Sequence, residues 1–310
     1  MFTSFYARGL GLRLSARDSI ELAASEGFAA VDLLVRDLLE QGEDSRDLQH
    51  LMKDLGLRGG AWALPVDWRS EPEVFERDRK ALPRLAAVAA ELGLFRTGTW
   101  VLPAGLLPGM DEGTDARARL VDAHVERLGL ISRVLSREGI RLGLEVIGPE
   151  TFRTGRGPEF IHRLGDPDLA ILIDRLNATL PSGSPRVGIL LDTFHLHASG
   201  ETLEPVLDRF GVESIVWVHV ADLPADFSGD RSEILDHDRG LPGESGLVPN
   251  AWVLKILDGS GYQGPISAEP LAGCRRLKGR DAAEIAHVCA LAMRSVWPGS
   301  QRPQNELSWT

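Results

Sequence analysis

Eight short runs of apolar and β-favouring residues recur along this chain, and stretches with helical periodicity separate them. The runs cover residues 2–6, 29–34, 57–63, 96–102, 142–147, 187–192, 215–220 and 265–269. The helical stretches include residues 15–26, 73–92, 116–138, 167–178, 250–257 and 281–296. Alternation of strand and helix is typical of parallel strands joined by helical crossovers. Eight such units predict an α/β fold, a (β/α)8 TIM barrel, with a doubly wound open sheet as the alternative.

The same pattern predicts a single domain. A length of 310 residues suits one barrel with long loops, and no Pro/Gly/Ser-rich linker divides the chain. No G-x-G-x-x-G motif follows the first run, so the dinucleotide-binding version of the open sheet loses its main support. We expect the barrel to span residues 1–296 and the polar residues 297–310 to form a C-terminal tail. Two long loops, 103–115 and 223–249, would lie on the C-terminal face of the barrel, where active sites are built.

Charge and cysteine content narrow the classes of partner. Lysine and arginine number 34 against 45 aspartates and glutamates, a formal charge of −11. Such a surface repels nucleic acid and anionic membranes, so we expect neither as a partner and expect a small molecule instead. Only Cys274 and Cys289 are present, without a Cys-x-x-Cys motif, and residues 1–23 lack the apolar core of a signal peptide. We therefore expect a cytoplasmic protein.

Ionisable residues stand at the carboxyl ends of the last four predicted strands. Glu145, Asp192, His219 and Glu269 each follow a small or apolar residue two positions earlier. On the period of two in a strand, each pair shares a face, and the charged member emerges from the packed interior into the barrel mouth. Three carboxylates gathered there repel one another strongly, and a divalent cation relieves that repulsion. Three oxygens and one nitrogen suit Mn²⁺ first, with Mg²⁺, Co²⁺ or Zn²⁺ as alternatives. Taken singly, each acid is better explained as a helix cap or an arginine partner; together the four favour a metal site.

Residues just beyond these strands offer further polar groups. His195 follows Asp192 by three positions and either folds over the mouth or lies in an exposed loop. Asp222 either orients a neighbouring group or caps a turn. Arg239, in a Pro/Gly-rich loop, either neutralises the acidic site, binds substrate oxygens or lies exposed.

Aromatic and histidine side chains elsewhere have two interpretations. Trp62 and Trp100, at the ends of the third and fourth strands, either wall the apolar face of a ring-shaped substrate or pack in the core or rim. The remaining histidines on helical stretches are expected at the surface; they are His50, His124, His162 and His287.

Five segments in the second half closely resemble one family. They read LEVIGPETFRT, LLDTFHLHASG, VWVHVADLP, DRGLPGE and ISAEP. Together they resemble the xylose-isomerase-like TIM-barrel superfamily of sugar phosphate isomerases and epimerases, and within it most of all the 2-keto-myo-inositol (inosose) isomerases. The resemblance covers residues 140–270; the first half follows only the strand–helix rhythm.

The resemblance implies roles for particular residues. It makes Glu145, Asp192, His219 and Glu269 the ligands of one divalent metal ion. It makes His195 and Arg239 substrate-contacting residues. The family's Pro-Gly-Glu-Gly reads Pro-Gly-Glu-Ser-Gly here, and the extra Ser245 puts the path of that loop in doubt. Members are often dimers, so a homodimer is the implied assembly.

The implied chemistry is isomerisation or epimerisation of a keto-sugar or keto-cyclitol. Such a reaction removes a proton beside a carbonyl and returns one, through an enediolate that the metal stabilises. Glu145 and Glu269, on opposite sides of the ligand, would act as base and acid.

Three other functions use similar residues. A metal-dependent dehydratase or lyase on a keto-cyclitol or dehydroshikimate-like acid shares the ligands and the enolate. An endonuclease-IV-like nuclease needs further histidines on the third and fourth strands, where this chain has GGAWALP and TGTWVLP. A non-catalytic sugar-binding barrel would not need the intact ligand set.

Overall fold

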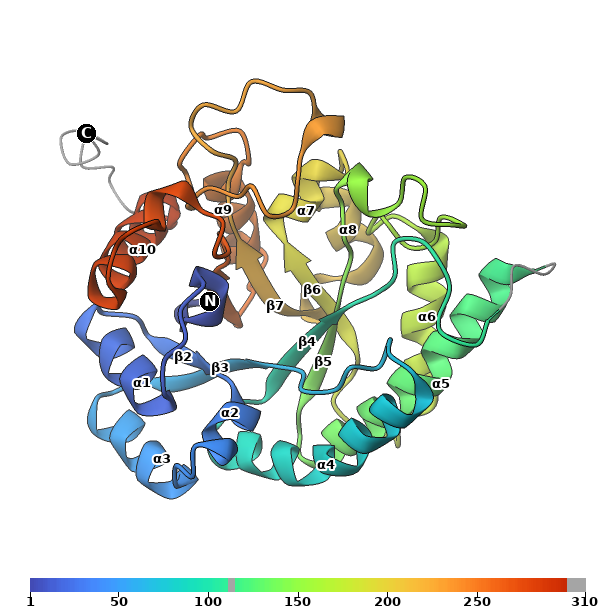
Figure 1. Cartoon of the computed structure of the whole chain (residues 1–310), viewed down its shortest axis with the longest axis horizontal. Helices are drawn as coiled ribbons and strands as arrows, with labels where there is room; N and C mark the ends of the chain where they lie inside the picture. Colours follow the sequence, from blue (N-terminus) through green and yellow to red (C-terminus); the bar gives the residue numbers. More distant parts are fainter. Residues whose placement is uncertain (111–114, 300–310) are drawn as a thin grey trace.

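The computed structural model describes residues 1–110 and 115–299, and its strands close into a parallel barrel in sequence order (Figure 1). The strands are β1 (Phe2–Tyr6), β2 (Ala30–Leu33), β3 (Arg58–Ala63), β4 (Arg96–Trp100), β5 (Arg141–Glu145), β6 (Gly188–Asp192), β7 (Ile215–Val220) and β8 (Pro265–Ala268). Each strand pairs with its neighbours in parallel, and β1 pairs with β8 to close the ring. The predicted (β/α)8 barrel is confirmed, and the open-sheet alternative is excluded.

Helices connect consecutive strands and surround the barrel (Figure 1). They are α1 (Ala16–Ser25), α2 (Val35–Glu40), α3 (Ser45–Asp54), α4 (Pro72–Glu91), α5 (Ala116–Arg137), α6 (Pro167–Ala178), α7 (Thr193–Ala198), α8 (Leu203–Phe210), α9 (Asn250–Gly259) and α10 (Ala282–Val296). The two pairs α2–α3 and α7–α8 were not predicted. Within the described part of the chain, no helix combines the length and apolar character needed to cross a bilayer.

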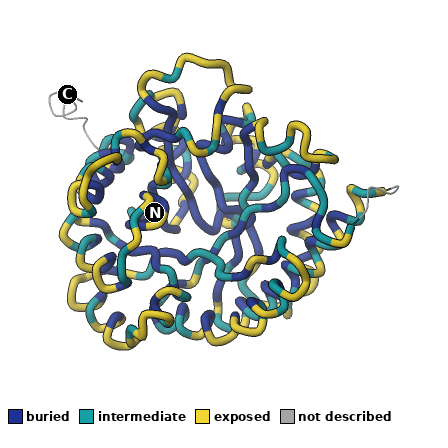
Figure 2. Tube along the Cα trace, viewed as in Figure 1, coloured by how far each residue is buried: buried dark blue, intermediate teal, exposed yellow. Residues whose placement is uncertain are grey.

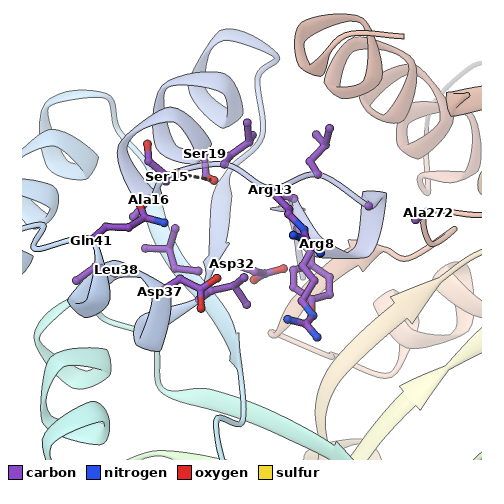
Figure 3. A pocket seen from close by; sticks show the side chains of 17 residues that line it. Arg8, Arg13, Ser15, Ala16, Ser19, Asp32, Asp37, Leu38, Gln41 and Ala272 are labelled. Carbon is purple, nitrogen blue, oxygen red and sulfur yellow. Dashed lines mark hydrogen bonds between the residues drawn. The ribbon is translucent and has the colours of Figure 1, made fainter. Parts of the chain in front are cut away.

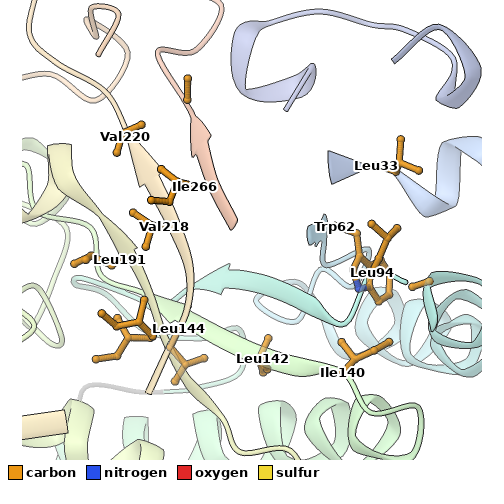
Figure 4. Packing of buried hydrophobic residues seen from close by; sticks show 14 of the residues in the cluster. Leu33, Trp62, Leu94, Ile140, Leu142, Leu144, Leu191, Val218, Val220 and Ile266 are labelled. Carbon is orange, nitrogen blue, oxygen red and sulfur yellow. The ribbon is translucent and has the colours of Figure 1, made fainter. Parts of the chain in front are cut away.

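The main hydrophobic core lies between the strands and the helices (Figures 2 and 4). Alternation along β5 explains it: Leu142 and Leu144 point outward and are at most 1% exposed, whereas Gly143 and Glu145 face the barrel interior. Burying each such leucine stabilises the fold by about 1.5–3 kcal/mol. The outward residues of successive strands therefore hold the helical layer in place, which leaves the inward residues free to build a site.

A smaller cluster fills the barrel interior beneath the mouth. It contains Tyr6, Ala61, Leu190 and Trp217. Gly98 makes room for it, since a Cβ atom at this position would lie 2.3 Å from the side chain of Leu190. Any larger residue at position 98 would displace this floor.

Two expectations concern residues only partly described. Of the expected tail, residues 297–299 are described and 300–310 lie outside the described residues. Of the expected loop 103–115, residues 111–114 also lie outside them.

Two histidines lie elsewhere than expected: His124, and His162, which lies in the loop before α6 and is half-buried. His124 is 0% exposed instead of on the surface. Its ring lies between those of Trp68 and Phe160, with centroids 4.8 and 5.0 Å away, because the inner face of α5 packs on the barrel.

Candidate metal centre

Four side chains from consecutive strands converge at the carboxyl end of the barrel. Glu145 ends β5, Asp192 ends β6, His219 lies near the end of β7 and Glu269 directly follows β8. One potential ligand atom from each lies within 4.8 Å of the others. Parallel strands bring their carboxyl ends to one rim, which is why residues far apart in sequence meet here.

His219 lies between two of the carboxylates. Its Nδ1 is 3.1 Å from Glu269 Oε2 and 3.6 Å from Glu145 Oε1. Neither ring nitrogen makes a well-directed hydrogen bond among the described residues, and Glu145 Oε1 is likewise buried without one. Tyr6 stacks on the His219 ring at 5.7 Å between centroids, and Trp217 meets it edge-on at 4.3 Å. The ring is therefore held firmly by its neighbours while its nitrogens lack directed partners.

The electrostatics of the cluster favour a bound cation. Burial raises the pKa of Glu145, and the charge of Glu269 adds to this effect. Burial alone would lower the pKa of His219, but the charges of Glu269 and Glu145 outweigh it and raise the pKa well above its ordinary value. Buried polar atoms without partners are costly. A divalent ion among the three carboxylates and the imidazole satisfies these atoms and balances the charge, so the donor set fits the metal expected from the sequence.

Asp192 also forms the N-terminal cap of α7. Its Oδ1 accepts from the backbone N–H groups of Phe194, at 2.7 Å, and His195, at 3.3 Å. Its Oδ2 accepts from Arg239 Nη1 at 2.7 Å. Burial raises its pKa, but the nearby Arg239 charge more than compensates, and the pKa falls to about 2. Asp192 is therefore held ionised and oriented from two sides.

Arg239 is buried among the acidic residues and is only 2% exposed. Besides Asp192, its guanidinium donates to Asp236 Oδ1 at 2.5 Å and to the backbone oxygen of Glu269 at 3.2 Å. The charges of Asp192 and Asp236 raise its pKa despite burial. These contacts are those expected of the neutralising role, and the substrate contact of Arg239 stays a prediction.

His195 is brought to the same centre by α7. Its Nε2 lies 3.1 Å from Arg239 Nη2 and 3.9 Å from both Glu145 Oε1 and Asp192 Oδ2. The side chain is buried, so it is not the exposed loop histidine of the alternative interpretation. This position leaves Nε2 directed at the atoms around which a ligand would bind.

Trp62 and Trp100, paired in the sequence analysis, lie in different places. A register irregularity between β2 and β3 inserts one residue, so Leu33 pairs with Trp62. Trp62 therefore points outward into the main core, near Leu94, and is 0% exposed (Figure 4). Because of this bulge, Trp62 does not line the mouth, and the expectation that it walls a substrate ring is replaced by the alternative of core packing. Trp100 is half-buried and pairs in register with Glu145, which keeps it beside the site.

Asp32 is a buried acid that the sequence analysis missed. Its carboxylate accepts from Ser4 Oγ at 2.7 Å, Ala61 N at 2.6 Å and Ser267 Oγ at 2.5 Å. Burial raises its pKa to about 6 although these hydrogen bonds lower it. The rule that marked the other acids, an ionisable residue near the end of an apolar strand, also marks Asp32.

Asp222 organises the loop that carries Arg239. Its two carboxylate oxygens accept from the backbone N–H groups of Leu223, Ser245, Gly246 and Val248 and from Ser245 Oγ. The extra serine, Ser245, therefore donates hydrogen bonds to Asp222, and these bonds fix the path of the loop. Asp222 serves the turn, because within the described residues its carboxylate accepts hydrogen bonds only from residues of this loop.

Comparisons with known proteins agree on the family of this chain. A family model described as a xylose isomerase-like TIM barrel matches residues 20–287. The chain is 26% identical over 169 residues to an inosose isomerase from Halalkalibacterium halodurans, covering 53% of this chain and 51% of that protein. It is 24% identical over 255 residues to a 3-dehydroshikimate dehydratase from Pseudomonas aeruginosa, covering 81% of this chain and 35% of that protein. The matches thus span about half and about a third of these relatives.

Among solved structures, the fold is similar to that of the IolI protein with a bound zinc atom. The TM-score is 0.74 at 17% identity, over 97% of this chain and all of that one. At this identity the likeness concerns the fold.

Proposed function

Because the chain belongs to the xylose isomerase-like TIM barrel family, we propose that it is a divalent-metal-dependent isomerase or epimerase of a keto-sugar or keto-cyclitol. The observation that carries the proposal is the convergence of Glu145, Asp192, His219 and Glu269 within 4.8 Å, with buried nitrogen and oxygen atoms that lack hydrogen-bond partners. Mn²⁺ is the ion we expect first. When bound, such an ion would supply positive charge that polarises a carbonyl group and favours its enediolate.

The two glutamates are the proposed proton carriers. They approach His219 Nδ1 from different strands, at 3.6 and 3.1 Å, which supports a position for them on either side of a ligand. One carboxylate removes the proton from the carbon beside the carbonyl, and the other returns a proton to the same or the neighbouring carbon. The bond to hydrogen that breaks is thereby replaced without any oxidant or reductant.

His195 and Arg239 have separate proposed roles. His195 lies beside the substrate oxygen on which negative charge develops, and its Nε2 accepts from Arg239 Nη2 at 3.1 Å, because a guanidinium can only donate. Arg239 is a positioning residue, because its hydrogen bonds fix the Asp192 carboxylate and reach His195 Nε2. Trp100, next to Glu145 in register, offers an apolar ring face to the substrate skeleton.

Hydrogen exchange in D₂O tests the proposal. Metal-loaded and EDTA-treated protein would be incubated with a panel of ketoses and inososes, and deuterium at the α-carbon measured by NMR. We expect exchange only with metal, and loss by a factor of about a hundred or more in Glu145→Gln and in Glu269→Gln. Glu126→Gln, an exposed glutamate on α5, is the matched control and keeps the wild-type rate. Absence of exchange with every panel member in metal-loaded protein contradicts the proposal.

A dehydratase acting on a keto-cyclitol or dehydroshikimate-like acid is the second candidate. The similarity to a 3-dehydroshikimate dehydratase over 81% of this chain favours it. Proton removal beside the carbonyl is the same first step, but a hydroxyl group then leaves as water. Two measurements distinguish this reaction from isomerisation. The conjugated enone product absorbs ultraviolet light, and the mass of the product is lower than that of the substrate by one water, about 18 mass units, whereas isomerisation leaves the mass unchanged.

A further inference from the structure

Three arginines on the β1–β4 side of the mouth, Arg8, Arg13 and Arg69, have no carboxylate oxygen within 4.0 Å among the described residues, and two of them, Arg8 and Arg69, line one cavity together. Arg8 begins the short helix after β1, and Arg69 lies in the loop between β3 and α4. Within residues 1–110 and 115–299, neither has a carboxylate oxygen within 4.0 Å, whereas the neighbouring Arg36 pairs with Asp78 at 3.2 Å. We call Arg8 and Arg69 the arginine pair.

Arg69 is held in a fixed pose with donors to spare. Its Nη1 donates to Thr99 Oγ1 at 3.1 Å and to the Trp100 backbone oxygen at 2.9 Å. The guanidinium carbon lies 3.8 Å from the centre of the Trp100 ring, a cation–π contact. The N–H groups on Nε and Nη2 have no partner among the described residues. A planar guanidinium anchored on one nitrogen presents the others for a planar, two-pronged contact.

One aromatic residue connects each arginine to the candidate metal centre. Trp100, beneath Arg69, pairs in register with Glu145. Arg8 lines the same cavity as Tyr6, whose ring stacks on that of His219. The positive side chains therefore stand on the side of the mouth that faces the acidic cluster.

Cavities beside the arginine pair have room for a ligand. One, of about 570 Å³, is lined by Arg8 and Arg13, with Asp32 and Asp37 across from them (Figure 3). A second, of about 360 Å³, is lined by both Arg8 and Arg69. The two share Arg8 and Asp37, so Arg8 stands where they adjoin.

Most acids in these cavities are already engaged. Asp78 is paired with Arg36 and Arg77, and Asp67 accepts from Ser70 Oγ at 2.7 Å. Asp32 is held by its two serines and a backbone N–H group. Asp37 is exposed in the first turn of α2, where the helix end favours its charge. Asp67 and Glu145 act on Arg69 only through their charges, so within the described residues no carboxylate makes a direct ion pair with either member of the arginine pair.

We propose that the arginine pair binds an oxyanion group of the substrate, a carboxylate or a phosphate monoester, while the carbonyl end of the same molecule lies at the candidate metal centre. The position of the carbonyl end rests on the proposed function. The substrate class is then an acidic ketose or keto-cyclitol. An anionic tail would be repelled by Glu145, Asp192 and Glu269, so the arginine pair also fixes which end of the molecule enters first.

A matched series of ligands tests this assignment. Fructose, fructuronate and fructose 6-phosphate share a skeleton and differ in carrying no anion, a carboxylate or a phosphate. Calorimetric titration of the full chain should show one or both anionic ligands binding about ten- to a hundredfold tighter than fructose, as expected for charge-assisted hydrogen bonds. The preferred member identifies the oxyanion. The preference should shrink as salt is raised.

Variants connect the preference to the arginines. Arg69→Gln should reduce the ratio of anionic to neutral affinity to within about threefold of unity, and Arg69→Lys should retain part of it. Arg8→Gln, at an exposed position, should reduce the ratio without a folding risk. Arg58→Gln is the control, because Arg58 lies 4.4 Å over the Phe2 ring at the opposite end of the barrel. Equal affinities for all three ligands, or a preference unchanged in both Arg69→Gln and Arg8→Gln, overturn the proposal.

Repeating the titration with EDTA-treated protein separates this inference from the proposed function. The arginine pair needs no metal, so its preference for anions should persist. Anion preference without metal-dependent hydrogen exchange supports the pair and contradicts the proposed reaction. Exchange at equal rates on neutral and anionic ketoses, unaffected by Arg69→Gln, supports the reaction and overturns the pair.

Discussion

The two halves of the barrel mouth differ in the charged side chains that they carry. The ends of β5–β8 bring three carboxylates and a histidine to one point. The ends of β1–β4 offer an aspartate bound to hydroxyls and, nearby, the arginine pair, which makes no ion pair with a carboxylate in the described part of the chain. The fold places both sets on the same rim, so the difference comes entirely from the side chains. One half is built to hold a cation, and the other has cations of its own.

Two buried aspartates, Asp32 and Asp192, show this difference between the two halves in their pKa values. Both are buried near the end of a strand, at 3% exposure. Burial raises the pKa of both, but Asp192 has Arg239 at 2.7 Å and its pKa is about 2, whereas Asp32 has only neutral donors and its pKa is about 6. The pKa of a buried carboxylate thus falls or rises according to whether the sequence brings an arginine to it.

The largest expected effect comes from removing that arginine. In metal-free protein, Arg239→Gln should lower the free energy of unfolding by about 3–5 kcal/mol, because Asp192 and Asp236 lose their buried counter-ion. Added Mn²⁺ should restore part of the loss. Urea unfolding with EDTA and with metal measures both, and Arg58→Gln, which loses only an exposed cation–π contact, should change by less than about 1 kcal/mol. A loss below about 1 kcal/mol in Arg239→Gln would show that the acids do not depend on it.

Buried titratable groups should give opposite pH dependences of stability. Asp32 has a folded pKa of about 6 against an ordinary 3.8, so the folded state holds its proton more tightly. Its stabilisation is complete below pH 4 and is lost as pH rises through 6. Burial lowers the pKa of His124 from 6.5 to about 4, so its contribution is complete above pH 6.5 and is lost as pH falls through 4. Each change is on the order of 3 kcal/mol.

Urea unfolding between pH 4 and 7 checks both signs. Relative to Asp32→Asn, the wild type should become less stable between pH 4 and 6 and then remain level. Relative to His124→Leu, the wild type should become less stable as pH falls from 6.5 to 4. A difference that is constant across this range for either variant would contradict the corresponding assignment.

Metal affinity is the next comparison. Asp192→Asn should weaken Mn²⁺ binding by about a hundredfold or more, since even groups behind the ligands typically change affinity 10–100-fold. Asp32→Asn, the matched buried aspartate, should change it by less than about threefold, because Asp32 contacts serines and a backbone amide instead of the cluster. Calorimetric titration of EDTA-treated, dialysed protein measures both. Equal losses in the two variants would mean that Asp32 belongs to the metal site.

Much of the barrel could be predicted because its signals are local. Apolar runs mark the strands, and the period of two places Glu145 and Glu269 on inward faces. The sequence offered neutralisation of the acidic site as one role of Arg239, but it could not specify which acid Arg239 would contact, since Asp192 is 47 residues away. The expectation for His124 was wrong although its spacing of four from Leu120 and Leu128 places it on the inward face of α5, because a histidine on a helix was taken to lie at the surface. Asp32 was missed although the strand-end rule applies to it, because its strand carries no second motif.

Trp62 shows the limit of the period-two rule. The extra residue in β3 turns Trp62 outward, and no local pattern announces a bulge. Sequence motifs alone therefore do not tell whether a tryptophan at the end of a strand packs in the core, as Trp62 does, or lies beside the mouth, as Trp100 does.

The smallest effects should separate Trp62 from Trp100. Trp62→Phe should cost about 1 kcal/mol of stability, limited because its indole N–H has no hydrogen-bond partner to lose, and should leave ligand affinity unchanged. Trp100→Phe should weaken binding of an anionic ketose severalfold, since the Arg69 guanidinium stacks on this ring and a cation–π contact is worth about 0.5–1 kcal/mol. Urea unfolding and calorimetry on both variants measure the pair of effects. An affinity loss in Trp62→Phe equal to that in Trp100→Phe would mean that the bulge does not remove Trp62 from the mouth.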